Sequence, residues 1–158
     1  AVQGTAAGAG LSLCASADLV VAVDSAKFTS AYTKAGLSPD GSSTYFLPRR
    51  IGDRRARELM LTNRVLSAAE AESWGLVNQV VPEDQLTEAT SALVSMMTAG
   101  PTRAFGAVKR LLNESSHTSL ETQMELETRE IASCAMSEDG QEGISAFLAK
   151  RAPSYRGQ

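Results

Sequence analysis

The first part of the chain switches between short apolar runs and polar, glycine-containing turns. The β-branched run 18–23 predicts a strand that is buried on both faces, and shorter strands are expected at 27–31 and 77–81. A helix of residues 9–15 should follow the small-residue turn near the N-terminus. The glycines and proline of residues 36–41 indicate a loop.

Three further helices in this part are predicted from residues suited to cap them. We expect Ser42 or Ser43 to cap a helix that runs through residue 50. We expect Asp53 to cap the helix 54–62, with Leu59, Met60 and Leu61 on its inner face. Ser67 and Glu70 have the spacing of a capping box, which predicts a short helix that reaches Trp74 and ends at Gly75.

The second part of the chain has the pattern of helices alone. We expect helices at 86–98, 102–113, 119–136 and 139–150, the first two separated by Gly100-Pro101, and a polar tail that is loose at its end. Leu120, Met124 and Ile131 form an apolar stripe on the third of them. The change of pattern near residue 100 predicts an α/β core at 1–99 followed by a helical region at 100–158.

Composition excludes several classes of protein. The chain has 158 residues, enough for one domain with a real core, and a net charge of -3 gives no footprint of nucleic-acid binding. No apolar run approaches the ~20 residues of a membrane span, and no secretory pattern is visible, so we expect a cytoplasmic protein. Cys14 and Cys134 are interpreted as buried free thiols in a reducing compartment, and a single histidine argues against a metal site.

The turn Gly4-Thr5-Ala6-Ala7-Gly8-Ala9-Gly10 is the first candidate for chemistry. Small residues allow another group to approach the backbone, and a helix that starts there presents free N–H groups. Those donors suit a ligand oxygen that carries or develops negative charge. The alternative is a tight strand-to-helix connection with no ligand.

Several motifs in one order carry a resemblance to a known family. They are the turn at 1–10, Ala17-Asp18-Leu19, Ala26-Lys27-Phe28, Gly36-Leu37-Ser38-Pro39, Arg50-Ile51-Gly52, Gly75-Leu76-Val77, Val81-Pro82, Glu142-Gly143 and the run 146–153. Together they resemble the enoyl-CoA hydratase/isomerase (crotonase) family over essentially the whole chain. The resemblance implies an α/β fold, with a crotonase-type ββα spiral core followed by a helical trimerisation region.

The resemblance also implies the partners of the protein. We expect an acyl-CoA thioester as substrate, coenzyme A only as part of that substrate, no metal or other cofactor, and no nucleic acid or membrane. The expected assembly is a homotrimer or a dimer of trimers. The chain starts without a methionine in what resembles the end of a buried strand, so we expect it to be the C-terminal part of a longer protein.

The family's oxyanion site maps onto the small-residue turn. The resemblance implies that the N–H of Ala9, after Gly8, is one of two donors to the thioester oxygen, with the second donor in the N-terminal part that this chain lacks. The two glutamates of the family's hydratases correspond to Ser12 and Tyr32. Neither side chain is a carboxylate, so we do not expect water addition by the two-glutamate mechanism.

Asp40 is the carboxylate that remains. It follows Pro39 directly, as in two branches of the family, the 1,2-epoxyphenylacetyl-CoA isomerase type and 4-chlorobenzoyl-CoA dehalogenase. We favour an enoyl-CoA isomerase with Asp40 as acid/base. The alternatives are dehalogenase-like hydrolysis with Asp40 as nucleophile, a hydratase, a non-catalytic acyl-CoA-binding paralogue, or an ordinary aspartate of a Pro-Asp-Gly turn.

The remaining candidates bind substrate. Tyr32 could line the acyl pocket beside Asp40, with Leu37 nearby, and Ser12 could hydrogen-bond substrate or water. We expect Asp40 to be partly buried and to face the same cavity as the Ala9 N–H. Phe147 and Lys150 correspond to family positions that contact the CoA nucleotide, and the alternative is a core phenylalanine and a surface lysine.

Overall fold

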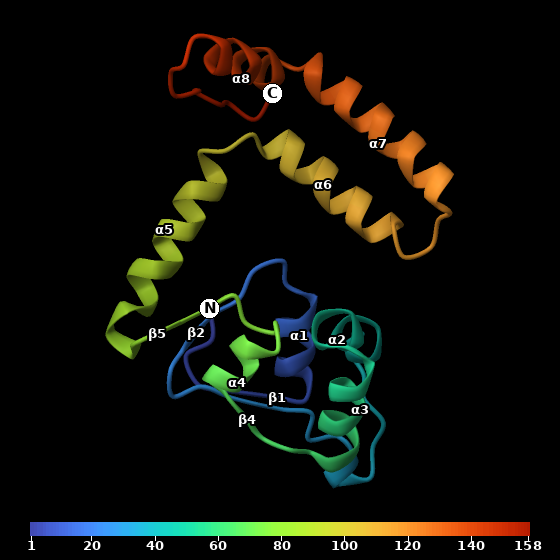
Figure 1. Ribbon diagram of the computed structural model, residues 1–158. Helices are drawn as coiled ribbons and strands as arrows, with labels where there is room; N and C mark the ends of the chain where they lie inside the picture. Colours follow the sequence, from blue (N-terminus) through green and yellow to red (C-terminus); the bar gives the residue numbers. More distant parts are fainter. The chain divides into compact units, whose positions relative to one another are not determined.

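The computed structural model describes residues 1–158, which form two compact units, Ala1–Ser91 and Ala92–Gln158 (Figure 1). All strands belong to the first unit, and the second unit is helical. The boundary between the units lies inside helix α5 (Leu86–Thr98), whereas the division predicted from the sequence lies directly after that helix. The expected change from β/α alternation to helices is confirmed.

Two small sheets form the centre of the first unit. In one sheet, β1 (Thr5–Ala7) pairs in parallel with β3 (Lys27–Thr29), which pairs antiparallel with β4 (Leu66–Ser67). In the other, β2 (Val21–Val23) pairs in parallel with β5 (Gln79–Val81). Every residue of β2 is buried, as its β-branched sequence predicts. The strands are shorter than the apolar runs that predict them.

Four helices complete this unit. They are α1 (Ala9–Ser16), α2 (Ser43–Ile51), α3 (Asp53–Thr62) and α4 (Ala68–Ser73), and α2 packs against both α1 and α3. Their apolar faces supply fully buried side chains to a common core, among them Leu11, Leu47 and Leu59, with Phe28 and Leu66 from the strands. Burial of each such side chain stabilises the fold by roughly 1.5–3 kcal/mol. Short 3₁₀ turns lie at Thr33–Ala35 and Glu83–Gln85.

The second unit contains the rest of α5 and three more helices. These are α6 (Thr102–Glu114), α7 (Leu120–Ala135) and α8 (Glu138–Leu148), and α7 packs against both α6 and α8. The predicted stripe on α7 is exposed in this chain, with Leu120 and Ile131 each 71% exposed and Met124 58% exposed. No helix combines the length and the apolar composition that a membrane span requires.

Two predicted helix caps form differently from the expectation. Ser42, one of the two residues expected to cap α2, does take the cap position, but its side chain makes no capping bond. Ser42 precedes α2 in a left-handed conformation with φ 61°, and its hydroxyl donates to the Gly41 carbonyl instead of accepting from the helix. Asp53 is the first residue of α3 rather than its cap, because Gly52 with φ 84° takes the cap position. The Asp53 carboxylate accepts a hydrogen bond from Arg57, 2.7 Å away.

Three expectations of burial also need correction. Leu61 is 71% exposed, because only Leu59 of the three apolar residues on α3 points fully into the core. Cys14 and Cys134 are free but only half-buried, and burial still raises the pKa of the Cys14 thiol.

The polar tail is held in place, contrary to the sequence prediction. The buried carboxylate of Asp139 in the first turn of α8 accepts hydrogen bonds from the N–H groups of Arg156 and Gly157, at 2.7 and 2.8 Å. In the same helix, Glu142 accepts two hydrogen bonds from Arg151 and one from the Ser154 N–H. These bonds join residues far enough apart that no local pattern in the sequence reveals them.

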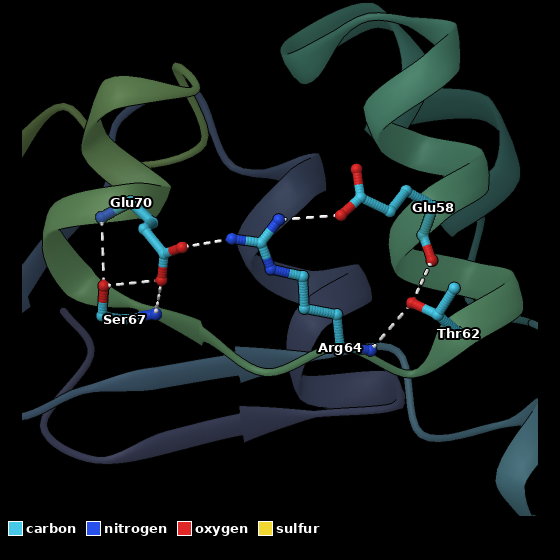
Figure 2. A network of polar contacts seen from close by, with 5 residues as sticks. All are labelled: Glu58, Thr62, Arg64, Ser67 and Glu70. Atoms are coloured by element: carbon cyan, nitrogen blue, oxygen red, sulfur yellow. Dashed lines mark hydrogen bonds and ion pairs between the residues drawn. The ribbon is translucent and has the colours of Figure 1, made fainter.

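The predicted capping box at the start of α4 is confirmed (Figure 2). The Ser67 hydroxyl accepts from the Glu70 N–H at 3.3 Å, and the Glu70 carboxylate accepts from the Ser67 N–H at 2.9 Å. Arg64 pairs with Glu70 and with Glu58 of α3, so its guanidinium links the two helices. Hydrogen bonds from Ser67 and the pairing with Arg64 lower the pKa of Glu70.

Replacing Ser67 by alanine should lower the free energy of unfolding by about 1 kcal/mol, because the first turn of α4 loses its capping acceptor. Urea denaturation of the full-length protein at fixed concentration measures this loss. Ser73→Ala is the matched control, since the Ser73 hydroxyl only donates to a carbonyl within the same helix. Equal losses in the two variants would contradict the capping role.

The tail should loosen when the solution is acidified. Hydrogen bonds from Arg151 and Ser154 lower the pKa of Glu142 from 4.5 to about 2, so the charged form is favoured by folding. The stabilisation is therefore complete above pH 4.5 and is lost as the pH falls through about 2. Hydrogen exchange, expressed as protection factors, should show the Ser154 amide losing protection in this range. The Arg151 amide, bonded to the Ala146 carbonyl, should keep its protection; parallel behaviour of the two amides would contradict the prediction.

Candidate functional site

The turn before α1 presents a free backbone donor. Gly8 caps α1 with φ 52° and ψ -119°, a conformation that glycine adopts more easily than residues with a Cβ. Its own N–H is bonded to the Thr29 carbonyl at 3.2 Å. Ala9 is the first residue of α1 and is exposed, and its N–H donates to no carbonyl of the chain. The turn therefore provides an unpaired donor at the positive end of a helix dipole.

The loop that carries Asp40 is attached to α1 by its main chain. The hydroxyl of Ser12, which is buried in α1, donates to the Asp40 carbonyl at 3.1 Å. The same carbonyl accepts from the N–H and the hydroxyl of Ser43, at 3.2 and 3.0 Å. A Cβ on Gly41 would lie 3.0 Å from the Ser12 Cβ, so glycine allows this close approach.

The Asp40 side chain is held by a tyrosine. The Tyr32 hydroxyl donates to Oδ1 of Asp40 at 2.5 Å and lies 3.5 Å from the Ser12 Oγ. The second oxygen, Oδ2, accepts no hydrogen bond from the chain. Asp40 is exposed, contrary to the partial burial that we expected, because Leu37 is itself 62% exposed and does not cover the carboxylate.

The backbone is strained on both sides of this loop. Ala31, directly before Tyr32, has φ 60°, and Ser42, two residues after Asp40, has φ 61°. A left-handed conformation costs a residue with a Cβ roughly 1–2 kcal/mol. Such conformations persist where surrounding contacts determine them, and they are common at functional sites.

The structure brings four of the eight predicted site residues into one cluster. Gly8, Ser12, Tyr32 and Asp40 lie together, and Ala9 begins the helix that contains Ser12. Leu37 is in the same loop, and its N–H donates to the Tyr32 carbonyl at 3.1 Å. Phe147 and Lys150 belong to the second unit, where both are exposed; Lys150 follows α8 with φ 53°.

Sequence reasoning missed two residues that shape this cluster. Ser43 was considered only as a helix cap, yet it binds the Asp40 carbonyl twice, and Gly41 allows the contact with Ser12. The sequence indicates the contact of Ser43 in part, because a serine three residues after an aspartate favours a local turn closed by hydrogen bonds. No pattern in the sequence indicates the contact between Gly41 and α1.

The chain is similar to known proteins over its whole length. The sequence model of the enoyl-CoA hydratase/isomerase family matches residues 1–158. The chain is 41% identical over 158 residues to an Escherichia coli K12 protein named 1,2-epoxyphenylacetyl-CoA isomerase, covering 100% of the chain and 60% of that protein. It is 36% identical over 150 residues to 4-chlorobenzoyl coenzyme A dehalogenase-1 of an Arthrobacter species, covering 95% of the chain and 54% of that protein.

A solved structure shows the same fold. The crystal structure of an enoyl-CoA hydratase from a Polaromonas species superimposes with a TM-score of 0.91 at 36% identity, covering 97% of this chain and 60% of that one. The chain thus spans well under two thirds of the length of these relatives. The expected α/β fold with its C-terminal helical region is confirmed. The chain belongs to the enoyl-CoA hydratase/isomerase family.

Proposed function

We propose that the protein containing this chain is an enoyl-CoA isomerase that uses Asp40 as acid/base and the Ala9 N–H as an oxyanion donor. One observation carries the proposal. Asp40 is a carboxylate with one oxygen held by Tyr32 and the other unpaired, and its loop is bonded to the helix that Ala9 begins.

The reaction needs one base and one site for negative charge. Asp40 takes a proton from the α-carbon of a β,γ-unsaturated acyl-CoA, which leaves a dienolate whose charge develops on the thioester oxygen. The Ala9 N–H stabilises that oxygen, together with a second donor expected from the part of the relatives that this chain does not span. Protonated Asp40 returns the proton to the γ-carbon, so one carboxylate serves both steps and the α,β-unsaturated isomer leaves.

The same site argues against rapid hydration. Water addition in this family uses two glutamates, and their positions here are Ser12 and Tyr32. The Ser12 side chain already has a structural role, since its hydroxyl donates to the Asp40 carbonyl and its Cβ lies against Gly41. Neither of these two positions therefore supplies a carboxylate to activate water.

Dehalogenation is the second candidate. The unpaired Oδ2 of Asp40 and the 36% identity to the Arthrobacter dehalogenase favour it. In that case Oδ2 attacks the ring carbon of an aryl-CoA, halide leaves, and water hydrolyses the resulting ester. A single turnover in ¹⁸O-water separates the two, because only this route puts the label into the Asp40 carboxylate and, in later turnovers, into the hydroxylated product.

The same proposal includes the substrate, the subunit assembly and the cellular location of the enzyme. The substrate is an acyl-CoA thioester, no cofactor is needed beyond its coenzyme A, and Phe147 and Lys150 contact the CoA nucleotide. The exposed apolar residues of the second unit, such as Leu120 and Ile131, are buried between subunits of a trimer or a dimer of trimers. We place the enzyme in the cytoplasm.

Replacing Asp40 by asparagine should lower kcat for the double-bond shift of a β,γ-unsaturated hexenoyl-CoA by at least about 100-fold. Binding of the thioester should change little, because the oxyanion donors remain. Absorbance of the conjugated product measures the first quantity and calorimetry the second. Asp24→Asn, at another exposed turn, is the control and should match the wild type. An unchanged kcat for Asp40→Asn would remove Asp40 from the mechanism.

The Ala9 donor can be removed without removing its helix. Ala9 is the first residue of α1, where proline is tolerated, so Ala9→Pro removes the N–H and keeps a φ that suits a helix. We expect a loss of about 10²–10³ in kcat, as for other oxyanion donors. Glu138→Pro, at the first position of α8, is the matched control and should retain activity. Equal activity of the two proline variants would show that Ala9 provides no oxyanion donor.

A further inference from the structure

Tyr32 is fixed at its main chain and at its ring. Its carbonyl accepts from the N–H groups of Ala35 and Leu37, at 2.9 and 3.1 Å, and the left-handed Ala31 precedes it. A Cβ on Gly8 would lie 3.7 Å from the Tyr32 Cζ, so the ring packs over the cap of α1. The ring therefore lies between the oxyanion turn and the Asp40 loop.

The hydroxyl of this fixed ring determines which oxygen of Asp40 is available. It donates to Oδ1, and the carbonyl of Asp40 is held separately by Ser12 and Ser43. An exposed carboxylate with a fixed main chain can still rotate about its side-chain torsions. The hydrogen bond from Tyr32 is the one contact within the chain that restricts this rotation and leaves Oδ2 unpaired.

We propose that Tyr32 is a positioning residue that holds Oδ1 of Asp40, so that Oδ2 alone removes and returns the proton. The inference rests on the proposed isomerase function and adds the group that aligns its base. A proton that Oδ2 removes from the α-carbon stays on that oxygen until it is returned to the γ-carbon. Transfer within one substrate molecule then competes with exchange into solvent.

The test compares Tyr32→Phe with the wild type, using hexenoyl-CoA deuterated at the α-carbon. The ring and its packing on Gly8 remain, and only the hydroxyl is lost. We expect kcat to fall by up to about 100-fold with KM changed less than about 2-fold, because the base is misaligned while binding is kept. The share of deuterium that reaches the γ-carbon should also fall. Tyr155→Phe, in the second unit, is the control.

A double-mutant cycle separates positioning from a general structural effect. If Tyr32 acts through Asp40, Tyr32→Phe should have no further effect in the Asp40→Asn background. Additive losses, or a wild-type kcat and label transfer in Tyr32→Phe, would overturn the inference. These outcomes can be told apart from a failure of the proposed function itself. If that function is wrong, Asp40→Asn alone leaves the rate of the double-bond shift unchanged.

Discussion

The hydrogen bond from the Ser12 hydroxyl to the Asp40 carbonyl joins the two segments on which the candidate site depends. Ser12 is on α1, whose first residue supplies the free N–H, and Asp40 is on a loop more than two dozen residues later in the chain. A Cβ on Gly41 would lie only 3.0 Å from the Ser12 Cβ, so glycine at this position favours the close approach that the bond requires. One buried hydroxyl and one glycine thus set how close the main chain of Asp40 lies to the helix that Ala9 begins.

The rest of the site follows from that attachment. The Tyr32 hydroxyl donates to the Asp40 carboxylate, and the Tyr32 ring packs on Gly8, which caps α1. The left-handed Ala31 and Ser42 lie at the two ends of the segment, where their cost is offset by these contacts. Ser12 and Tyr32 therefore both contact Asp40, one at its main chain and the other at its side chain.

Features set by local sequence were predicted well. The capping box of Ser67 and Glu70, the buried strand β2 and the start of α1 each depend on a few neighbouring residues. Ser42 takes the expected cap position, but with φ 61° its side chain makes no capping bond. The expectations for Asp53 and the tail were wrong because Gly52 takes the cap of α3 and the distant carboxylate of Asp139 holds the tail. For the same reason the sequence suggested Tyr32 and Asp40 separately, while their hydrogen bond required the fold.

The central claim is that Asp40 moves a proton on a thioester whose oxygen is bound at the start of α1. Deuterium exchange at the α- and γ-carbons of hexenoyl-CoA in deuterated water, followed by nuclear magnetic resonance, tests it most directly in the full-length protein. We expect exchange at both carbons by the wild type and at least about 100-fold slower exchange by Asp40→Asn. Undiminished exchange by that variant, or hydration by the wild type that outpaces exchange, would contradict it.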